Sequence, residues 1–128
     1  MPMTDGADAF DVFTGRVLAT LACNSADHIA RTVEAAHPAQ ARWGARSPGE
    51  RALHLRKAAT RLEQEADALA RLVVQENGKT FAQARFGDVA ACIGMFRFFA
   101  DLVEQRRPAV RALGPIESEE RLCPLGVI

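Results

Sequence analysis

Apolar residues repeat at helical spacing through the middle of the chain. From Ser47 to Asn77, leucine, alanine and valine recur at alternating intervals of four and three residues. This period places one apolar stripe along one face of a helix. Ser47 and Glu50 have the spacing of a capping box, and Pro48 suits the first helical position. We predict one long helix, or two helices with a bend near Gln64. The stripe consists of Leu55, Ala59, Leu62, Ala66, Leu69 and Val73.

A further helix is predicted directly after this one. Gly78 can adopt the left-handed conformation that ends a helix, and Thr80 can cap the next through its hydroxyl. We expect that helix to be irregular at Gly87, to run to about Glu104, and to be closed by Arg107–Pro108. One face of it carries Val89, Ile93, Phe96 and Val103, with Phe99 close by.

Shorter elements are predicted before the first long helix. Residues 10–21 combine apolar residues with a Thr-Gly turn, which is typical of a β-hairpin. Asn24 or Ser25 is then expected to cap a helix that runs to about Ala36. Pro38 should end that helix, because the residue before proline avoids helical geometry.

The C-terminal part of the chain has an extended pattern. Residues 109–120 contain a Gly-Pro break, and residues 117–122 are predicted to form a strand. The elements together predict an α+β chain that is mainly helical. Its length allows one small domain.

Charge and composition exclude several classes of partner. The chain has 16 basic and 16 acidic residues, so its net charge is zero. Binding to nucleic acid or to an anionic membrane is therefore not expected. No apolar run approaches the ~20 residues of a membrane-spanning helix. The start of the chain lacks the basic and apolar regions of a signal peptide, so we expect a cytoplasmic location.

Cysteine and histidine residues offer no organised chemistry. Cys92 is the tempting nucleophile, but an unpaired cysteine in a helix usually packs as a small apolar residue. We expect the same of Cys23 and Cys123, and neither a disulfide framework nor a metal site. No two histidines have the helical spacing of metal ligands. The histidines are His28, His37 and His54.

Other polar and aromatic candidates have simpler interpretations. Acidic residues near position 65 are expected to form a solvated, ion-paired helix face rather than an acid–base pair. They are Glu63, Glu65 and Asp67. Lys79 follows a glycine but lacks the spacing of a phosphate loop. Phe96 and Phe99 are expected in the core, whereas Phe98 points off the main stripe and is the best candidate for an interface.

Several short motifs resemble the N-terminal region of the aldehyde dehydrogenase superfamily. They occur in the family's order and span nearly the whole chain. Each is weak alone, and together they are specific. The motifs are Asp11–Thr20, Trp43 with Ser47–Arg51, Gln75–Arg85, Phe96–Ala100 and Arg121–Ile128. Val12 replaces the family's usual proline, Cys123 its usual glutamate, and one extra residue lies near Phe86.

The resemblance implies an aldehyde dehydrogenase fold fragment. Residues 10–21 would be its hairpin, 24–104 its helical part, 109–123 part of an oligomerisation arm, and 125–128 the start of a cofactor-domain strand. The chain would lack the complete Rossmann-like cofactor domain and the catalytic domain. In the parent reaction a cysteine thiolate attacks an aldehyde, hydride passes to NAD or NADP, and water releases a carboxylate.

Only two kinds of site residue are implied by the resemblance. Gly87, Asp88 and Ala91 would face the substrate entrance, within a register doubt of one position, and Glu76 would help to hold a monovalent metal cation. No catalytic or cofactor-binding residue is expected in residues 1–128, and no cofactor for this chain alone. We therefore expect a truncated, inactive N-terminal segment. The alternatives are one half of a split dehydrogenase, whose partner is the catalytic part or a sister subunit, and a non-enzymatic helical interaction module. Homo-oligomers could form through 109–123.

Overall fold

The computed structural model describes residues 6–106, 109–120 and 123–128. Helices dominate it, and the described strands form two separate two-stranded antiparallel sheets. The mainly helical α+β fold expected from the sequence is therefore confirmed. The elements in order are β1 (Gly6–Phe10), β2 (Val17–Ala22), α1 (Ala26–Gly44), α2 (Pro48–Gln64), α3 (Ala66–Asn77), the π-helical segment η1 (Gln83–Val89), α4 (Ala90–Gln105), β3 (Ala109–Leu113) and β4 (Ile116–Glu120).

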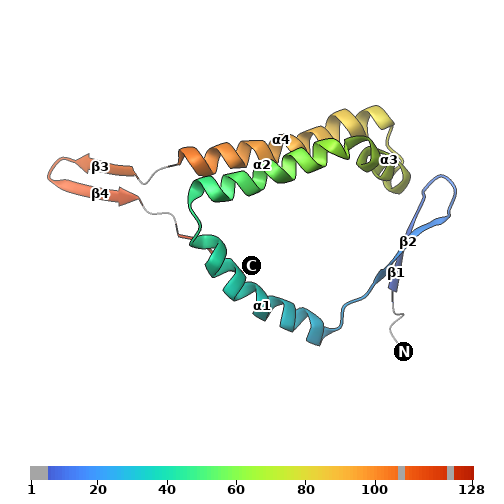
Figure 1. Ribbon diagram of the computed structural model, residues 1–128, viewed down its shortest axis with the longest axis horizontal. Helices are drawn as coiled ribbons and strands as arrows, with labels where there is room; N and C mark the ends of the chain where they lie inside the picture. Colours follow the sequence, from blue (N-terminus) through green and yellow to red (C-terminus); the bar gives the residue numbers. More distant parts are fainter. Residues whose placement is uncertain (1–5, 107–108, 121–122) are drawn as a thin grey trace.

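The long helices α2 and α4 lie side by side, and η1 packs against α3 (Figure 1). The hairpin of β3 and β4 projects beyond one end of this helical pair, whereas α1 crosses below it as a separate arm. The N-terminal hairpin lies beside the other end, next to α3. The packed centre of the molecule is thus the α2–α4 pair and its continuation into α3 and η1.

The N-terminal hairpin starts earlier than the predicted residue 10. Its ladder pairs Gly6 with Ala22 and Phe10 with Val17, so residues 11–16 form the connection. Asp11 holds this connection, because its Oδ1 accepts hydrogen bonds from the backbone nitrogens of Phe13 and Thr14 at 2.9 and 3.0 Å. The first strand was missed because its small residues carry little β-strand signal. The turn itself lies where the Thr-Gly pair placed it, with Gly15 at a φ of 69°.

The prediction that Pro38 ends the first helix is wrong. Ser25 caps α1 as expected, accepting a hydrogen bond from the backbone nitrogen of His28, but the helix continues to Gly44 with Pro38 inside it. Proline removes one backbone donor and leaves the carbonyl one turn earlier without its helical partner. No residue of α1 is buried. Water can therefore satisfy that carbonyl, which lowers the cost of an internal proline.

The second and third helices resolve the choice left open at Gln64. The chain forms two helices, because α2 ends at Gln64 and α3 begins at Ala66. The capping box of Ser47 and Glu50 is present in both directions. Gly78 ends α3 at a φ of 70°, in the left-handed conformation expected of it.

The core is small and rich in alanine. Its main buried cluster consists of Ala59, Ala66, Ala70, Ala84, Val89 and Ile93, with Leu62, Leu69, Val73, Val74 and Phe96 packed around them. Ala52 and Ala100 are also buried. Alanine lets helices approach closely but buries little apolar area. Salt bridges from Arg56 to Asp101 and from Arg97 to Glu63 join α2 to α4 across the solvated face. The acidic residues near position 65 are ion-paired, as expected, because Glu65 pairs with Arg61 and Asp67 with Arg85 in addition to the Glu63 pair.

The C-terminal residues form one hairpin and an irregular end. Strands β3 and β4 pair antiparallel, with Ala109 opposite Glu120 and Leu113 opposite Ile116, on either side of a turn that contains Gly114. Residues 123–128 form no strand. A strand needs a neighbour for its backbone hydrogen bonds, and the described part of the chain offers none there. The predicted helix end at 107–108 and strand end at 121–122 lie outside the described residues.

Candidate functional site

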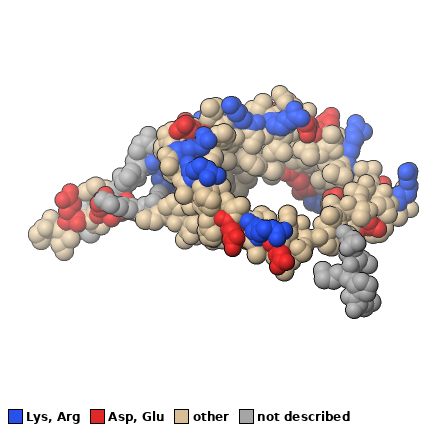
Figure 2. All heavy atoms as spheres, turned by 60° about the horizontal axis from the view of Figure 1, so that its bottom comes forward, with Lys and Arg blue, Asp and Glu red and all other residues tan. Residues whose placement is uncertain are grey.

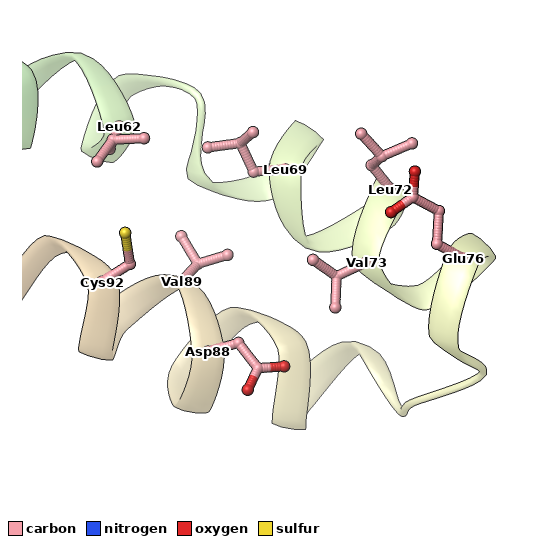
Figure 3. A pocket seen from close by; sticks show the side chains of 8 residues that line it. All are labelled: Leu62, Leu69, Leu72, Val73, Glu76, Asp88, Val89 and Cys92. Carbon is pink, nitrogen blue, oxygen red and sulfur yellow. The ribbon is translucent and has the colours of Figure 1, made fainter. Parts of the chain in front are cut away.

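An apolar cavity of about 260 Å³ lies where the two helix pairs meet (Figure 3). Helices α2 and α3 form one wall, and η1 with the start of α4 forms the other. Its lining residues are Leu62, Leu69, Leu72, Val73, Glu76, Asp88, Val89 and Cys92. Aliphatic side chains cover most of the surface, and the polar groups are two carboxylates and one thiol. Such a lining favours apolar groups of a ligand or of another protein segment.

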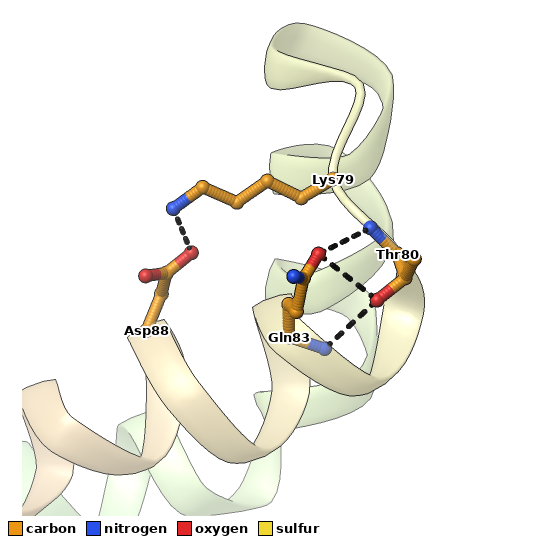
Figure 4. A network of polar contacts seen from close by, with 4 residues as sticks. All are labelled: Lys79, Thr80, Gln83 and Asp88. Atoms are coloured by element: carbon orange, nitrogen blue, oxygen red, sulfur yellow. Dashed lines mark hydrogen bonds and ion pairs between the residues drawn. The ribbon is translucent and has the colours of Figure 1, made fainter.

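Asp88 is held at the edge of this cavity by Lys79 (Figure 4). The Nζ of Lys79 lies 2.7 Å from Oδ2 of Asp88, and both side chains are roughly half exposed. The segment between them starts with a reciprocal cap. Thr80 Oγ1 accepts from the Gln83 backbone nitrogen, and Gln83 Oε1 accepts from the Thr80 backbone nitrogen, both at 3.2 Å. These contacts fix the chain between α3 and η1.

The structure brings only some of the sequence-predicted site residues together. Asp88 and Glu76 line the cavity from opposite walls. Gly87 and Ala91 are exposed and do not line it. Asp88, Val89 and Cys92 form this part of the wall. The place of Gly87, Asp88 and Ala91 at a substrate entrance stays a prediction. Leu72 also lines the cavity but was not part of the predicted stripe. Its position on the helix next to Leu69 and Val73 could have identified it.

The expectation that the cysteines pack as buried apolar residues is wrong. All three are exposed, and Cys92 presents its sulfur to the cavity. The helical face of Cys92 is apolar, but no further element covers that face in the described residues, so the thiol remains accessible. The carboxylate of Asp88 lies one helical turn earlier on the same wall.

The described residues assemble no group of three or more histidine, cysteine, aspartate or glutamate side chains that could hold a metal ion. Glu76 and Asp88 are the two carboxylates at the cavity. The role of Glu76 as a cation ligand therefore stays a prediction. None of the described helices has both the length and the apolar character needed to cross a lipid bilayer.

Large apolar side chains remain exposed outside the cavity. Ile29 and Val33 form an exposed pair on α1, and Phe98 on α4 is 58% exposed, in line with its predicted place off the main stripe. Phe96 packs against the core as predicted, whereas Phe99 is exposed and lies edge-on to Phe98. Figure 2 shows an opening through the molecule, bordered by the helical pair and by α1. An exposed helix such as α1 gains little stability alone. Its exposed apolar side chains are typical of a surface that packs against more protein.

Comparison with known proteins assigns this architecture to a class. Residues 3–128 match the sequence model of the aldehyde dehydrogenase family. The chain is 37% identical over 100 residues to 2-aminomuconic semialdehyde dehydrogenase of Mus musculus, covering 78% of this chain and 20% of that protein. It superimposes with a TM-score of 0.78 on a crystal structure of a putative aldehyde dehydrogenase from Burkholderia cenocepacia, at 26% identity. That match covers 85% of this chain and 22% of the other.

These proteins are oxidoreductases, and the chain belongs to the aldehyde dehydrogenase family. It spans about a fifth of the length of the curated relatives it matches. The family depends on NAD(P), and one similar structure, PnpE in complex with nicotinamide adenine dinucleotide, has a TM-score of 0.78 at 26% identity. It too matches 85% of this chain and 22% of its own. The described residues contain no parallel strand followed by a glycine-rich turn and a helix, so they do not fit a dinucleotide site of that type.

Proposed function

We propose that this chain is the scaffold segment of an NAD(P)-dependent aldehyde dehydrogenase and has no dehydrogenase activity by itself. The parent reaction oxidises an aldehyde to a carboxylate. The observation that carries the proposal is the open shape of the isolated chain. Its described elements superimpose on proteins about four to five times longer, while α1 and the cavity between α3 and η1 stay uncovered. The surface is therefore built to pack against more polypeptide.

The environment of Cys92 supports the absence of activity. This thiol lies in a cavity lined by apolar groups and two carboxylates, with no histidine among the lining residues to take up its proton. The nearby cation, Lys79, is engaged with Asp88. Catalysis would need a nucleophile and a cofactor site from another polypeptide, which is either the rest of the same enzyme or a separate subunit. A cytoplasmic location accompanies this proposal.

The experiment compares three preparations. The purified chain, a polypeptide equivalent to the remainder of a relative, and the two produced together are each assayed for NAD(P)H formation with a panel of aldehydes. We expect activity only from the combined preparation. Turnover by the chain alone above a buffer control would refute the proposal, and a Cys92→Ala variant would then show whether this thiol is responsible.

The C-terminal hairpin supports a second role in assembly. Strands β3 and β4 project from the helices, and Val110 and Ile116 are exposed on them (Figure 1). An isolated two-stranded hairpin is only marginally stable in water, so it gains from pairing with another sheet. We expect the arm 109–123 to join a second copy or a sister subunit. Light scattering of the combined preparation with and without residues 109–120 tests this. An unchanged mass would exclude the arm as the contact.

The isolated chain is expected to be self-associated or incompletely folded, because its apolar faces are uncovered. Thermal unfolding combined with light scattering distinguishes this from the alternative. A monomer with a sharp, cooperative transition would instead favour a free-standing helical interaction module.

A further inference from the structure

The spacing of buried residues changes where η1 joins α4. Ala84 and Val89 are five residues apart and both buried, and Ile93 follows four residues later. In an α-helix with 3.6 residues per turn, residues four apart lie about 40° apart around the axis, whereas residues five apart lie about 140° apart. A continuous α-helix therefore cannot direct both Ala84 and Val89 into the same core.

The chain resolves this conflict with a π-helix. Residues Gln83–Val89 adopt the wider turn whose hydrogen bonds run from residue i to i+5. One such turn brings residues five apart onto one face. Ala84 and Val89 consequently join the same buried cluster, together with Ile93. The π-helical segment is thus the joint between two packing surfaces, η1 on α3 and α4 on α2.

The residues between the two anchors contribute little to the core. Phe86 is 73% exposed, the largest exposed fraction among the helical aromatic residues. Gly87 has open space where a side chain would begin, with nothing within 4 Å. The Arg85 guanidinium lies 5.5 Å from the centre of the Phe86 ring and pairs with Asp67 on α3, so Phe86 is supported from outside the core.

We infer that the chain carries one residue more than the helical packing requires, at Phe86–Gly87, and that the π-helical turn absorbs it and displays Phe86 on the surface. The ends of the segment are fixed independently, by the cap at Thr80 and by the buried Val89. An extra residue between two fixed anchors has to widen the helix or disrupt the core, and the buried anchors show that it widens the helix.

Deletion of single glycines tests this inference with a matched control. Gly87 and Gly94 are both exposed helical glycines with nothing within 4 Å of a Cβ. Removing Gly87 reduces the spacing from Ala84 to the next anchor from five to four, which suits an α-helix. Removing Gly94 reduces the spacing from Ile93 to Ala100 from seven to six, which rotates two buried residues from about 20° to about 120° apart.

The readout is the urea midpoint of the helical circular dichroism signal of the full chain. All variants are measured at one protein concentration, because self-association makes the midpoint depend on concentration. We expect the Gly87 deletion to unfold at a midpoint closer to that of the unaltered chain, and the Gly94 deletion to lose most of its transition. A Gly87 deletion whose midpoint is closer to that of the Gly94 deletion would overturn the inference.

A second variant separates the extra residue from its side chain. Phe86→Ala keeps the residue count and removes the exposed ring. If Phe86 lies outside the core, this substitution leaves the urea midpoint close to that of the unaltered chain, as is usual for surface changes. A loss as large as that of the Gly94 deletion would show that Phe86 supports the fold, and would contradict the assignment of this position as the extra residue.

Discussion

The backbone nitrogen of Val12 donates a hydrogen bond of 2.8 Å to the carbonyl oxygen of Gln75. Val12 lies in the connection of the N-terminal hairpin, and Gln75 lies in the last turn of α3. Carbonyl groups in the last turn of a helix have no partner within the helix. The hairpin supplies one, and thereby attaches to the helical part. Val12 stands where the aldehyde dehydrogenase family usually has proline, and proline has no backbone hydrogen to donate.

Val12→Pro should detach the hairpin from α3. Proline removes the donor, so the Gln75 carbonyl loses its partner, at a cost of about 1 kcal/mol for a typical hydrogen bond. Val12→Ala keeps the donor and shortens the side chain in the same place, which makes it the control. Urea unfolding of both variants checks this. If Val12→Pro were as stable as Val12→Ala, the hydrogen bond would carry no net stability.

Gly78→Ala should destabilise the chain where α3 ends. Gly78 has a φ of 70°, and a methyl group there would meet Val12 Cγ2 at 3.3 Å. The left-handed conformation costs a residue with a Cβ roughly 1–2 kcal/mol. Gly94→Ala is the matched control, because Gly94 is helical with open space around it and alanine should add about 1 kcal/mol of helix propensity. Thermal unfolding should therefore shift in opposite directions for the two variants. A shift in the same direction would contradict this assignment.

Local signals explain which elements the sequence predicted. Ser47 with Glu50 and Gly78 act through contacts within a few residues of themselves, so their motifs identify helix ends without knowledge of the fold. The prediction that Pro38 ends α1 was wrong because the effect of a proline depends on how exposed the helix is. A proline ends a buried helix, but α1 has no buried residue and tolerates the missing donor. Exposure is a property of the whole molecule, which a local pattern does not contain.

The cavity was harder to predict for a similar reason. Its wall near Asp88 depends on the π-helical turn, which changes the direction of the side chains that follow it, and α-helical spacing does not predict that change. The thiol of Cys92 is accessible because none of the described elements covers it. The spacing of residues along the chain cannot predict this. The apolar stripe of α2 and α3, by contrast, is set by periodicity and lies on the packed face as predicted.

Stability should fall in acid through two carboxylates. Backbone hydrogen bonds from Phe13 and Thr14 lower the pKa of Asp11, and those from the backbone and side chain of Ser47 lower the pKa of Glu50. A group with a lowered pKa in the folded state stabilises the fold above its unfolded pKa of about 4 and loses this contribution as pH falls through the folded value.

We therefore expect the urea midpoint to decrease below about pH 4. The Asp11→Asn, Glu50→Gln double variant should show a flatter decrease, because neither amide takes up a proton in this range. An identical acid profile for the variant and the unaltered chain would show that these two groups do not carry the effect.

Arg56 should join α2 to α4 in a salt-dependent way. Its guanidinium pairs with Asp101 and Glu104, and these partners raise its pKa. Because the side chains are partly exposed, the gain is screened by salt. Arg56→Met should lower the urea midpoint slightly at low ionic strength and by less in 1 M salt. Arg61→Met removes a pair with Glu65 across one helix turn and should show a smaller effect, since it joins no second helix. Equal effects would mean that the crosslink between helices adds nothing.

Cys92 should react with a thiol reagent in the native chain. Its sulfur faces the open cavity between α3 and η1, so a maleimide can reach it without unfolding. Labelling of a Cys23→Ser, Cys123→Ser variant, followed by mass spectrometry with and without urea, isolates this thiol. We expect labelling in both conditions, with the native rate within about tenfold of the unfolded rate, because the open cavity leaves the sulfur accessible to the reagent. Labelling that requires urea would show that other groups cover the cavity in solution, as expected if copies of the chain associate through this face.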